Sequence, residues 1–154
     1  MNKYMQEAIE LSEENLITNN GGPFGACVVK DGVIIGYGSN NVLKNNDPTA
    51  HAEIMAIRDA CKNINSYDLT GCVIFTTCYP CPMCLSAIIW ANIKKIYYGN
   101  TRKDAANIGF RDDFIYDFIE NKCSSDLLSF ECINHEDTIK TFNKYLDKED
   151  KTIY

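Results

Sequence analysis

The pattern of apolar and polar positions predicts a helix followed by a hairpin at the N-terminus. Between residues 3 and 18, apolar side chains recur at helical spacing among acidic positions, which indicates an amphipathic helix. The β-rich runs 25–30 and 33–37 flank Asp31-Gly32, a two-residue turn signal that favours antiparallel pairing. This part of the chain therefore predicts one helix and two paired strands.

Helices and strands alternate through the middle of the chain. A polar loop at 38–50 overlaps the start of a predicted helix from Thr49 to about Ile64, in which apolar residues recur three and four positions apart. The continuous β-branched and aromatic run 72–77 predicts a strand buried on both faces. A helix from Pro82 to about Asn92 and a strand at 95–99 follow, and this helix supplies the crossover that a parallel strand pair requires. The alternation indicates an α/β layer structure.

The C-terminal third carries weaker signals. After a loop near 100–109, we expect a short helix at 112–119, a last strand at 127–133 and a last helix at 136–146. The chain has 154 residues and no internal repeat or low-complexity tract, so it fits a single domain, 1–154, that buries its core without disulfide support.

Composition and charge narrow the class of protein. The formal net charge of -6 argues against a nucleic-acid-binding surface, which normally carries a basic patch, and favours a small, free substrate. Glutamates are spread through Met1 to Leu16, so we expect neither a secretory signal nor a membrane span there, and a cytoplasmic location follows by default. The eight cysteines are then expected to be reduced thiols rather than a disulfide framework.

Two short segments carry the candidate chemistry, His51-Ala52-Glu53 and Pro80-Cys81-Pro82-Met83-Cys84. One imidazole, from His51, and two thiolates, from Cys81 and Cys84, suit zinc, and three protein ligands leave a fourth position for water, as in catalytic zinc sites. Glu53 would carry the proton of that water, whose pKa zinc lowers to about 7. The H-x-E…P-C-x-x-C arrangement is the established signature of the zinc deaminases of nucleobases.

Blander interpretations of the same residues remain open at this point. Cys78, three residues before Cys81, could complete a closed structural zinc site or suggest an iron–sulfur cluster. A closed site leaves Glu53 without a role, and Cys78 falls at the end of a predicted strand rather than at the helix tip, so we favour the open site. A zinc-stabilised binding module without catalysis is the alternative from another class.

The resemblance to a known family is wider than the metal motif. The chain resembles the bacterial guanine deaminases of the cytidine deaminase superfamily along almost its whole length, from the glycine-rich start of the first strand to the C-terminal tyrosine. The segments that carry the likeness are Gly21-Gly22-Pro23-Phe24-Gly25-Ala26, Asn40-Asn41, Asn46 to Glu53, Pro80 to Cys84, Trp90, Gly109-Phe110, Phe114-Ile115-Tyr116 and Tyr154.

The resemblance implies an architecture and an assembly. The expected fold is the cytidine deaminase-like three-layer α/β/α fold with a central mixed five-stranded sheet. One zinc per subunit and a homodimer are implied as well. In that dimer the C-terminal segment, about 135–154, crosses to cover the active site of the partner.

The resemblance also implies roles for individual residues. Phe24 and Trp90 would line or stack on the base, Asn40 would hydrogen-bond the purine, and Ala52 belongs to the same binding site. Asp112 would be a second proton carrier that reads the guanine amino edge, and Tyr154 would close the pocket. One position departs from the family, because Tyr79 stands where relatives commonly have glutamate before Pro-Cys, so any role of that carboxylate is absent.

The implied activity is hydrolytic deamination of guanine to xanthine and ammonia, in purine catabolism or salvage, with a small purine base as the partner and no nucleic acid or membrane. A deaminase of another base or nucleoside, such as cytosine or guanosine, is the alternative. A tRNA adenosine deaminase shares the metal motif, but the acidic charge disfavours docking of an RNA.

Overall fold

The structure is a computed structural model that describes residues 2–110, 112–122 and 127–153. It divides into two compact units, Met1–Tyr116 and Asp117–Tyr154, and each unit is described by itself. No helix in the described residues is long and apolar enough to cross a bilayer.

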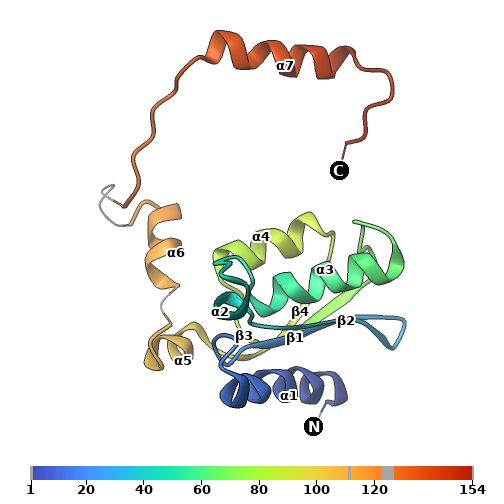
Figure 1. The fold of residues 1–154 in the computed structure, drawn as a ribbon, viewed down its shortest axis with the longest axis vertical. Helices are drawn as coiled ribbons and strands as arrows, with labels where there is room; N and C mark the ends of the chain where they lie inside the picture. The colour runs from blue at the N-terminus through green and yellow to red at the C-terminus, as the bar shows by residue number, and fades with distance from the viewer. Residues whose placement is uncertain (1, 111, 123–126, 154) are drawn as a thin grey trace. The chain divides into compact units, whose positions relative to one another are not determined.

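A mixed four-stranded sheet forms the centre of the first unit, in the order β2-β1-β3-β4 (Figure 1). The hairpin of β1 (Gly25–Lys30) and β2 (Val33–Ser39) is antiparallel, as predicted. β3 (Val73–Cys78) pairs with β1 antiparallel and with β4 (Lys95–Asn100) parallel, so the predicted crossover pairing is confirmed. The expected sheet of five strands is wrong by one strand in the described part of the chain.

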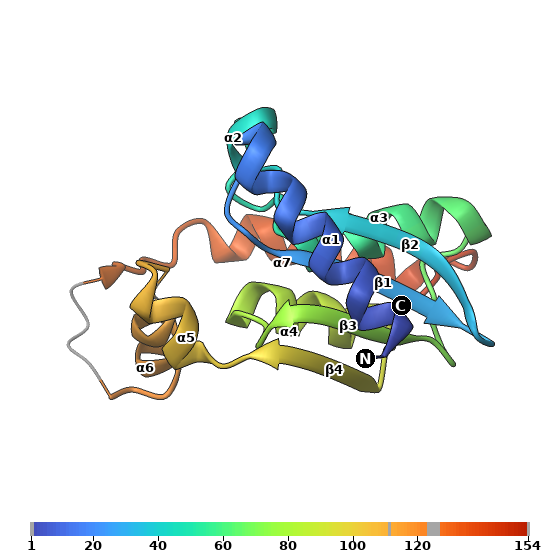
Figure 2. The same ribbon diagram turned by 90° about the horizontal axis from the view of Figure 1, so that it is seen from below.

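Helices cover both faces of this sheet (Figures 1 and 2). The helix α1 (Lys3–Thr18) lies on one face, and α3 (Ala52–Ile64) and α4 (Pro82–Trp90) lie on the other. β1 and β3 are buried along almost their whole length because the two layers sandwich them, which matches their largely apolar and β-branched sequences. The larger core lies under α3 and α4 and consists of Ala26, Val28, Ala52, Ala56, Ala60, Leu69, Cys72, Ile74, Ile88, Ala91 and Ile93.

Two glycines in β2 let α3 approach the sheet closely. A Cβ added at Gly38 would lie 2.1 Å from the carbonyl oxygen of Ala52, and one at Gly36 would lie 2.4 Å from that of Ala56. Both clashes are with helix backbone, which cannot move aside as a flexible side chain can. The glycines therefore set the distance between the sheet and the helix that begins at Ala52.

Three short helices complete the connections of the first unit. α2 (Val42–Asn45) and α5 (Arg102–Asn107) lie in segments expected to be loops, while α6 (Asp113–Ile119) confirms the predicted short helix and runs into the second unit. A capping box starts α5, in which Thr101 and Asp104 satisfy each other's backbone amides.

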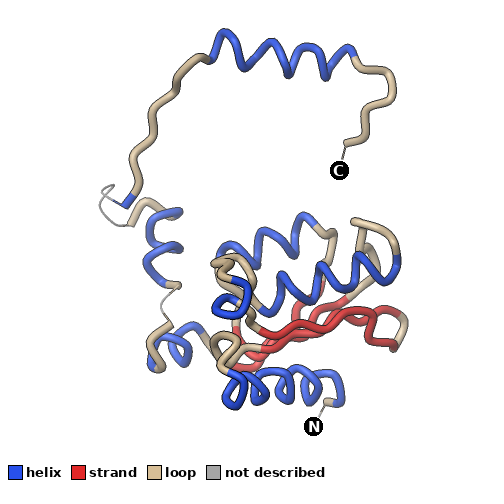
Figure 3. Tube along the Cα trace, viewed as in Figure 1, coloured by secondary structure: helices blue, strands red, loops and turns tan. Residues whose placement is uncertain are grey.

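The second unit contains α7 (His135–Asp147), which confirms the last predicted helix (Figure 3). The strand predicted at 127–133 is wrong, because this segment is outside the four-stranded sheet. A strand exists only where a neighbour accepts and donates its backbone hydrogen bonds, and within this unit the segment has no such neighbour among the described residues.

The close approach of β2 and α3 predicts the effect of adding one methyl group. Gly38→Ala should lower the free energy of unfolding by about 1–3 kcal/mol, since the new Cβ must push the backbone of α3 outward. Val33→Ala, in the exposed first position of the same strand, is the control and should cost less than about 1 kcal/mol. Urea unfolding of both variants checks this, and equal losses would show that the glycine contact is unimportant.

Candidate active site

A turn at residues 47–49 and the start of α3 position His51. The side chain of Asp47 accepts hydrogen bonds from the amide of Thr49 at 2.8 Å and from its hydroxyl at 2.6 Å, and these bonds lower the pKa of the Asp47 carboxyl. His51 itself has extended backbone angles and is the N-cap of α3. It was expected inside the first turn and lies one position before it, whereas Glu53 is in that turn, as predicted.

Cys81 and Cys84 come from the start of α4. Cys81 is the N-cap, Pro82 occupies the first helical position as the sequence predicted, and the amide of Cys84 donates to the Cys81 sulfur at 3.5 Å. Both thiols are buried. The N-terminal ends of α3 and α4 therefore lie close together near the end of β3.

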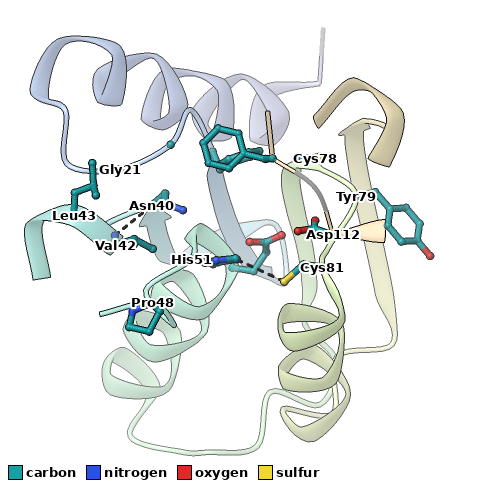
Figure 4. Close-up of a pocket in the computed structure, with 14 residues that line it drawn as sticks. Gly21, Asn40, Val42, Leu43, Pro48, His51, Cys78, Tyr79, Cys81 and Asp112 are labelled. Carbon is teal, nitrogen blue, oxygen red and sulfur yellow. Dashed lines mark hydrogen bonds between the residues drawn. The ribbon is translucent and has the colours of Figure 1, made fainter. Parts of the chain in front are cut away.

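The three candidate ligands are close enough to hold one ion. The Nδ1 atom of His51 lies 3.6 Å from the sulfur of Cys81 and 3.6 Å from that of Cys84 (Figure 4 draws the contact with Cys81). Tetrahedral zinc, with bonds of about 2.0–2.1 Å to nitrogen and 2.3 Å to sulfur, separates nitrogen and sulfur ligands by about 3.6 Å. The donor set and its spacing thus fit one zinc ion.

The two thiols form a coupled pair. A hydrogen bond from the Cys84 thiol lowers the pKa of Cys81 to about 4, and the same hydrogen bond, together with burial, raises the pKa of Cys84. The hydrogen bond to Cys81 also raises the pKa of His51. One thiolate forms readily and the second resists ionisation, so this group of residues is best satisfied by a cation that displaces the shared proton.

Cys78 does not join the three ligands. It is the last residue of β3, and its sulfur approaches the carbonyl oxygen of Thr101 at 3.7 Å. Burial raises the pKa of its thiol to about 11, which favours the neutral form. Within the described residues, only His51, Cys81 and Cys84 gather as a metal-binding group around this position. The geometry favours three protein ligands over the closed site.

Glu53 is the buried carboxyl group beside the ligands. Its side chain is 6% exposed, and the hydroxyl of Thr76 in β3 donates to its Oε1 at 3.2 Å. Burial raises the pKa of this carboxyl, so it holds a proton more readily than an exposed glutamate. A buried acid with a raised pKa is suited to accept and return protons near neutral pH.

His51, Glu53 and Cys81 lie in the wall of a cavity. Its volume is about 380 Å³, within the usual range of roughly 300–1,000 Å³ for small-molecule sites. Phe24 and Asn40 line it, and Phe110 packs edge-on against Phe24 with ring centroids 4.9 Å apart. The full lining is Gly21, Gly22, Phe24, Asn40, Val42, Leu43, Pro48, His51, Glu53, Cys78, Tyr79, Cys81, Phe110 and Asp112 (Figure 4).

Asp112 lines this cavity and directly precedes α6. Burial raises the pKa of its carboxyl, and the nearby Cys81 adds to that shift. One turn later, the hydroxyl of Tyr116 donates to the carbonyl of Pro80 at 2.7 Å, and the ring of Tyr116 lies against the guanidinium of Arg102. The segment that carries Asp112 is thereby tied to the turn that carries Cys81.

The other predicted site residues fall elsewhere. Trp90 is at the opposite end of α4 from Cys81, is 68% exposed and does not line the cavity. Ala52 is a core residue against Gly38, and Tyr154 lies outside the described residues. Sequence reasoning missed Val42 and Leu43, whose helix α2 was interpreted as loop, and Pro48 was interpreted only as part of a turn.

Known proteins are similar to this chain in sequence and in structure. Residues 1–100 match the cytidine and deoxycytidylate deaminase zinc-binding region. The chain is 42% identical to the guanine deaminase of Bacillus subtilis, over 98% of this chain and 97% of the relative. The chain belongs to the cytidine and deoxycytidylate deaminase family. The X-ray structure of the Bacillus subtilis guanine deaminase superposes on this deaminase with a TM-score of 0.93, covering 100% and 99% of the two chains.

Other relatives are named for a different substrate or were solved with a different ligand. The tRNA-specific adenosine deaminase of Haemophilus influenzae is 37% identical over 84% of this deaminase and 77% of its own length. A relative solved in complex with 2,6-diaminopurine is 28% identical, with a TM-score of 0.68 and coverage of 77% and 69%. The family is therefore settled, and the substrate depends on the cavity.

Tyr79, the position expected to depart from the family, contacts two side chains of this deaminase. Its ring packs edge-on against Tyr98 at 5.1 Å, and the guanidinium of Arg102 lies 5.6 Å from its centroid. In Figure 4 the Tyr79 ring points away from His51 and Cys81. Tyr79 therefore lines part of the cavity while its ring packs against Tyr98 and Arg102, and it places no carboxylate next to the ligands.

The ligand geometry predicts which cysteines hold the metal. Cys84→Ser should lose the zinc of the deaminase, because a neutral hydroxyl is a far weaker ligand than a thiolate. Cys78→Ser is the matched control and should keep about one zinc per chain, because Cys78 is outside the ligand group. Elemental analysis of the purified variants checks both. A zinc-free Cys78→Ser protein that remains folded would instead establish a four-ligand closed site.

Proposed function

We propose that the protein is a zinc-dependent hydrolytic guanine deaminase that converts guanine and water to xanthine and ammonia. The observation that carries the proposal is the position of Glu53 beside the His51, Cys81 and Cys84 ligands, at a cavity of about 380 Å³. The likeness to the Bacillus subtilis guanine deaminase over nearly the whole chain supports guanine as the substrate.

The residues of this chain divide the chemistry among them. His51, Cys81 and Cys84 would hold the zinc, which when bound supplies a Lewis acid that makes water nucleophilic near neutral pH. Glu53 removes a proton from the attacking water and returns protons to the ring nitrogen and to the departing amine. The amino group leaves guanine as ammonia, and the water oxygen remains as the new carbonyl of xanthine.

Apolar and polar residues of the cavity wall position the base. Phe24, supported edge-on by Phe110, offers an apolar wall for the flat ring. Asn40 offers hydrogen-bonding capacity on one side. Asp112 serves as a second proton carrier at the amino edge. Ala52 and Trp90 remain predictions of the resemblance, with no contact to the cavity in a single chain to support them.

Guanine deamination predicts a substrate panel and a mutant phenotype. The purified zinc protein should turn over guanine in preference to guanosine, cytosine and adenosine, and Glu53→Gln should lower kcat by about 10²–10⁴ because its amide cannot carry protons. Zinc content should be unchanged in that variant, since Glu53 is not a ligand. Glu14→Gln, an exposed carboxyl on α1, is the matched control and should behave like the parent.

The panel also decides among the alternatives. Clear turnover of another base without guanine turnover would contradict the substrate assignment. Binding of tRNA at moderate salt would favour the activity of the Haemophilus influenzae relative, against which the net charge of -6 argues. Activity of Glu53→Gln equal to that of the parent would point to a non-catalytic zinc module.

We further infer a cytoplasmic homodimer in which the C-terminal segment, about 135–154, serves the site of the partner. Each unit exposes apolar side chains when taken by itself. In the second unit Phe142 and Leu146, four residues apart on α7, are 71% and 67% exposed. In the first unit Ile89 and Trp90 at the end of α4 are 65% and 68% exposed. Apolar area of this kind is usually covered by a partner.

A complementation experiment tests whether the C-terminus acts across subunits. Glu53→Gln and Tyr154→Ala chains, each inactive or impaired alone, are co-expressed and purified as a mixture. If Tyr154 serves the partner's site, mixed dimers contain one intact site, and roughly a quarter of parental turnover should return. Activity no greater than the sum of the two variants would place Tyr154 in its own subunit's site. Analytical ultracentrifugation of the parent protein measures its oligomeric state and so tests the dimer separately.

A further inference from the structure

One side chain of α1 hydrogen-bonds the backbone of two residues that line the cavity, without lining it itself. Asn15 is 3% exposed, and its Nδ2 atom donates to the carbonyl of Gly22 at 2.8 Å and to the carbonyl of Asn40 at 2.8 Å. Both amide hydrogens of the side chain are therefore used. These bonds span 7 and 25 residues and join the two segments that line the cavity on that side.

The two segments that Asn15 joins are packed without spare room. The amide of Asn40 donates to the carbonyl of Phe24 at 3.0 Å. A Cβ added at Gly21 would lie 2.0 Å from the Oδ1 atom of Asn40 and 2.5 Å from its carbonyl oxygen. The main chain at Asn40 is thus fixed on three sides, by Asn15, Phe24 and Gly21.

The side chain of Asn40 has a defined polarity as a consequence. The amide of Val42 donates to its Oδ1 at 3.1 Å (Figure 4). Because the oxygen accepts this backbone proton, the amide nitrogen is directed into the cavity, where it can only donate. The cavity therefore presents a donor at Asn40, suited to an acceptor atom of a bound heterocycle.

We propose that Asn15 is a positioning residue for substrate recognition: it holds the carbonyls of Gly22 and Asn40 so that the Asn40 amide faces the cavity as a donor. The identity of the heterocycle as guanine rests on the proposed function, whereas the link from Asn15 to Asn40 does not. Asn15 has no contact with the metal ligands or with Glu53 in the described contacts, so its effect falls on binding rather than on proton transfer.

Kinetics of two substitutions test this role. Asn15→Ala should raise the KM for guanine about tenfold and leave kcat nearly unchanged, the pattern of a lost binding interaction. Asn15→Asp keeps the size of the side chain but turns an acceptor oxygen toward the two carbonyls, so it should raise KM at least as much. Better binding by Asn15→Asp than by Asn15→Ala would show that size, not donation, matters, and would overturn the proposal.

A double substitution separates positioning from general destabilisation. If Asn15 acts through Asn40, the KM of Asn15→Ala combined with Asn40→Ala should match that of Asn40→Ala alone. If the KM increases of the two single variants instead multiply in the double variant, Asn15 acts independently of Asn40 and has a purely structural role. Ser12→Ala is the matched control, because its hydroxyl bonds only the carbonyl of Ile9 within α1, and its KM should equal that of the parent.

Hydrogen exchange keeps the test independent of the substrate. In Asn15→Ala the amides of Asn40 and Val42 should exchange about tenfold faster than in the parent, while both rates stay unchanged in Ser12→Ala. If the parent fails to turn over guanine, the proposed function falls, and these two rates still decide the proposal. Unchanged exchange at both amides in a folded Asn15→Ala protein would overturn it.

Discussion

The close approach of α3 to β2 is the constraint on which the site depends. Because Gly36 and Gly38 have no side chains, the helix backbone lies against the strand, and this contact fixes where His51 and Glu53 emerge. β3 ends beside them, and α4 begins a few residues later. The start of α4 therefore brings Cys81 and Cys84 within reach of the imidazole. A parallel β3 and β4 require α4 as their crossover. The ligands are therefore a consequence of the layer packing rather than of a flexible loop.

The donor set of the site suits a divalent cation. The hydrogen bond between the thiols makes Cys81 strongly acidic and opposes ionisation of Cys84, while burial raises the pKa of the neighbouring Glu53. A bound divalent ion would stabilise both thiols as thiolates and the nearby carboxylate, and so would oppose the raised pKa values of Cys84 and Glu53. Zinc binding consequently supports the packing at the start of α4 as well as the chemistry, and the folded state gains stability with occupancy.

Local signals account for what the sequence could predict. The hairpin at Asp31-Gly32, the buried run of β3 and the Pro82 start of α4 each have a cue within a few residues. The four residues of α2 are too short for a hydrophobic period, and so Val42 and Leu43 were missed. The strand expected at 127–133 depended on a neighbour that no local pattern specifies. Asn15 could not be found at all, since its two acceptors are backbone groups distant in sequence.

The arrangement of donors and acceptors in the cavity bears on which base fits. Glu53 and Asp112 are carboxyl groups near the metal ligands, and the Asn40 amide is a donor on another wall. The edge of guanine that must face the ligands carries N–H donors at N1 and at the 2-amino group, whereas O6 and N7 are acceptors and N9 carries a further N–H. Adenine presents an acceptor at N1, so a carboxylate oxygen facing it has no donor, and a buried polar group without a partner is costly. A cavity with this polarity therefore discriminates by the penalty for the wrong base as much as by attraction for the right one.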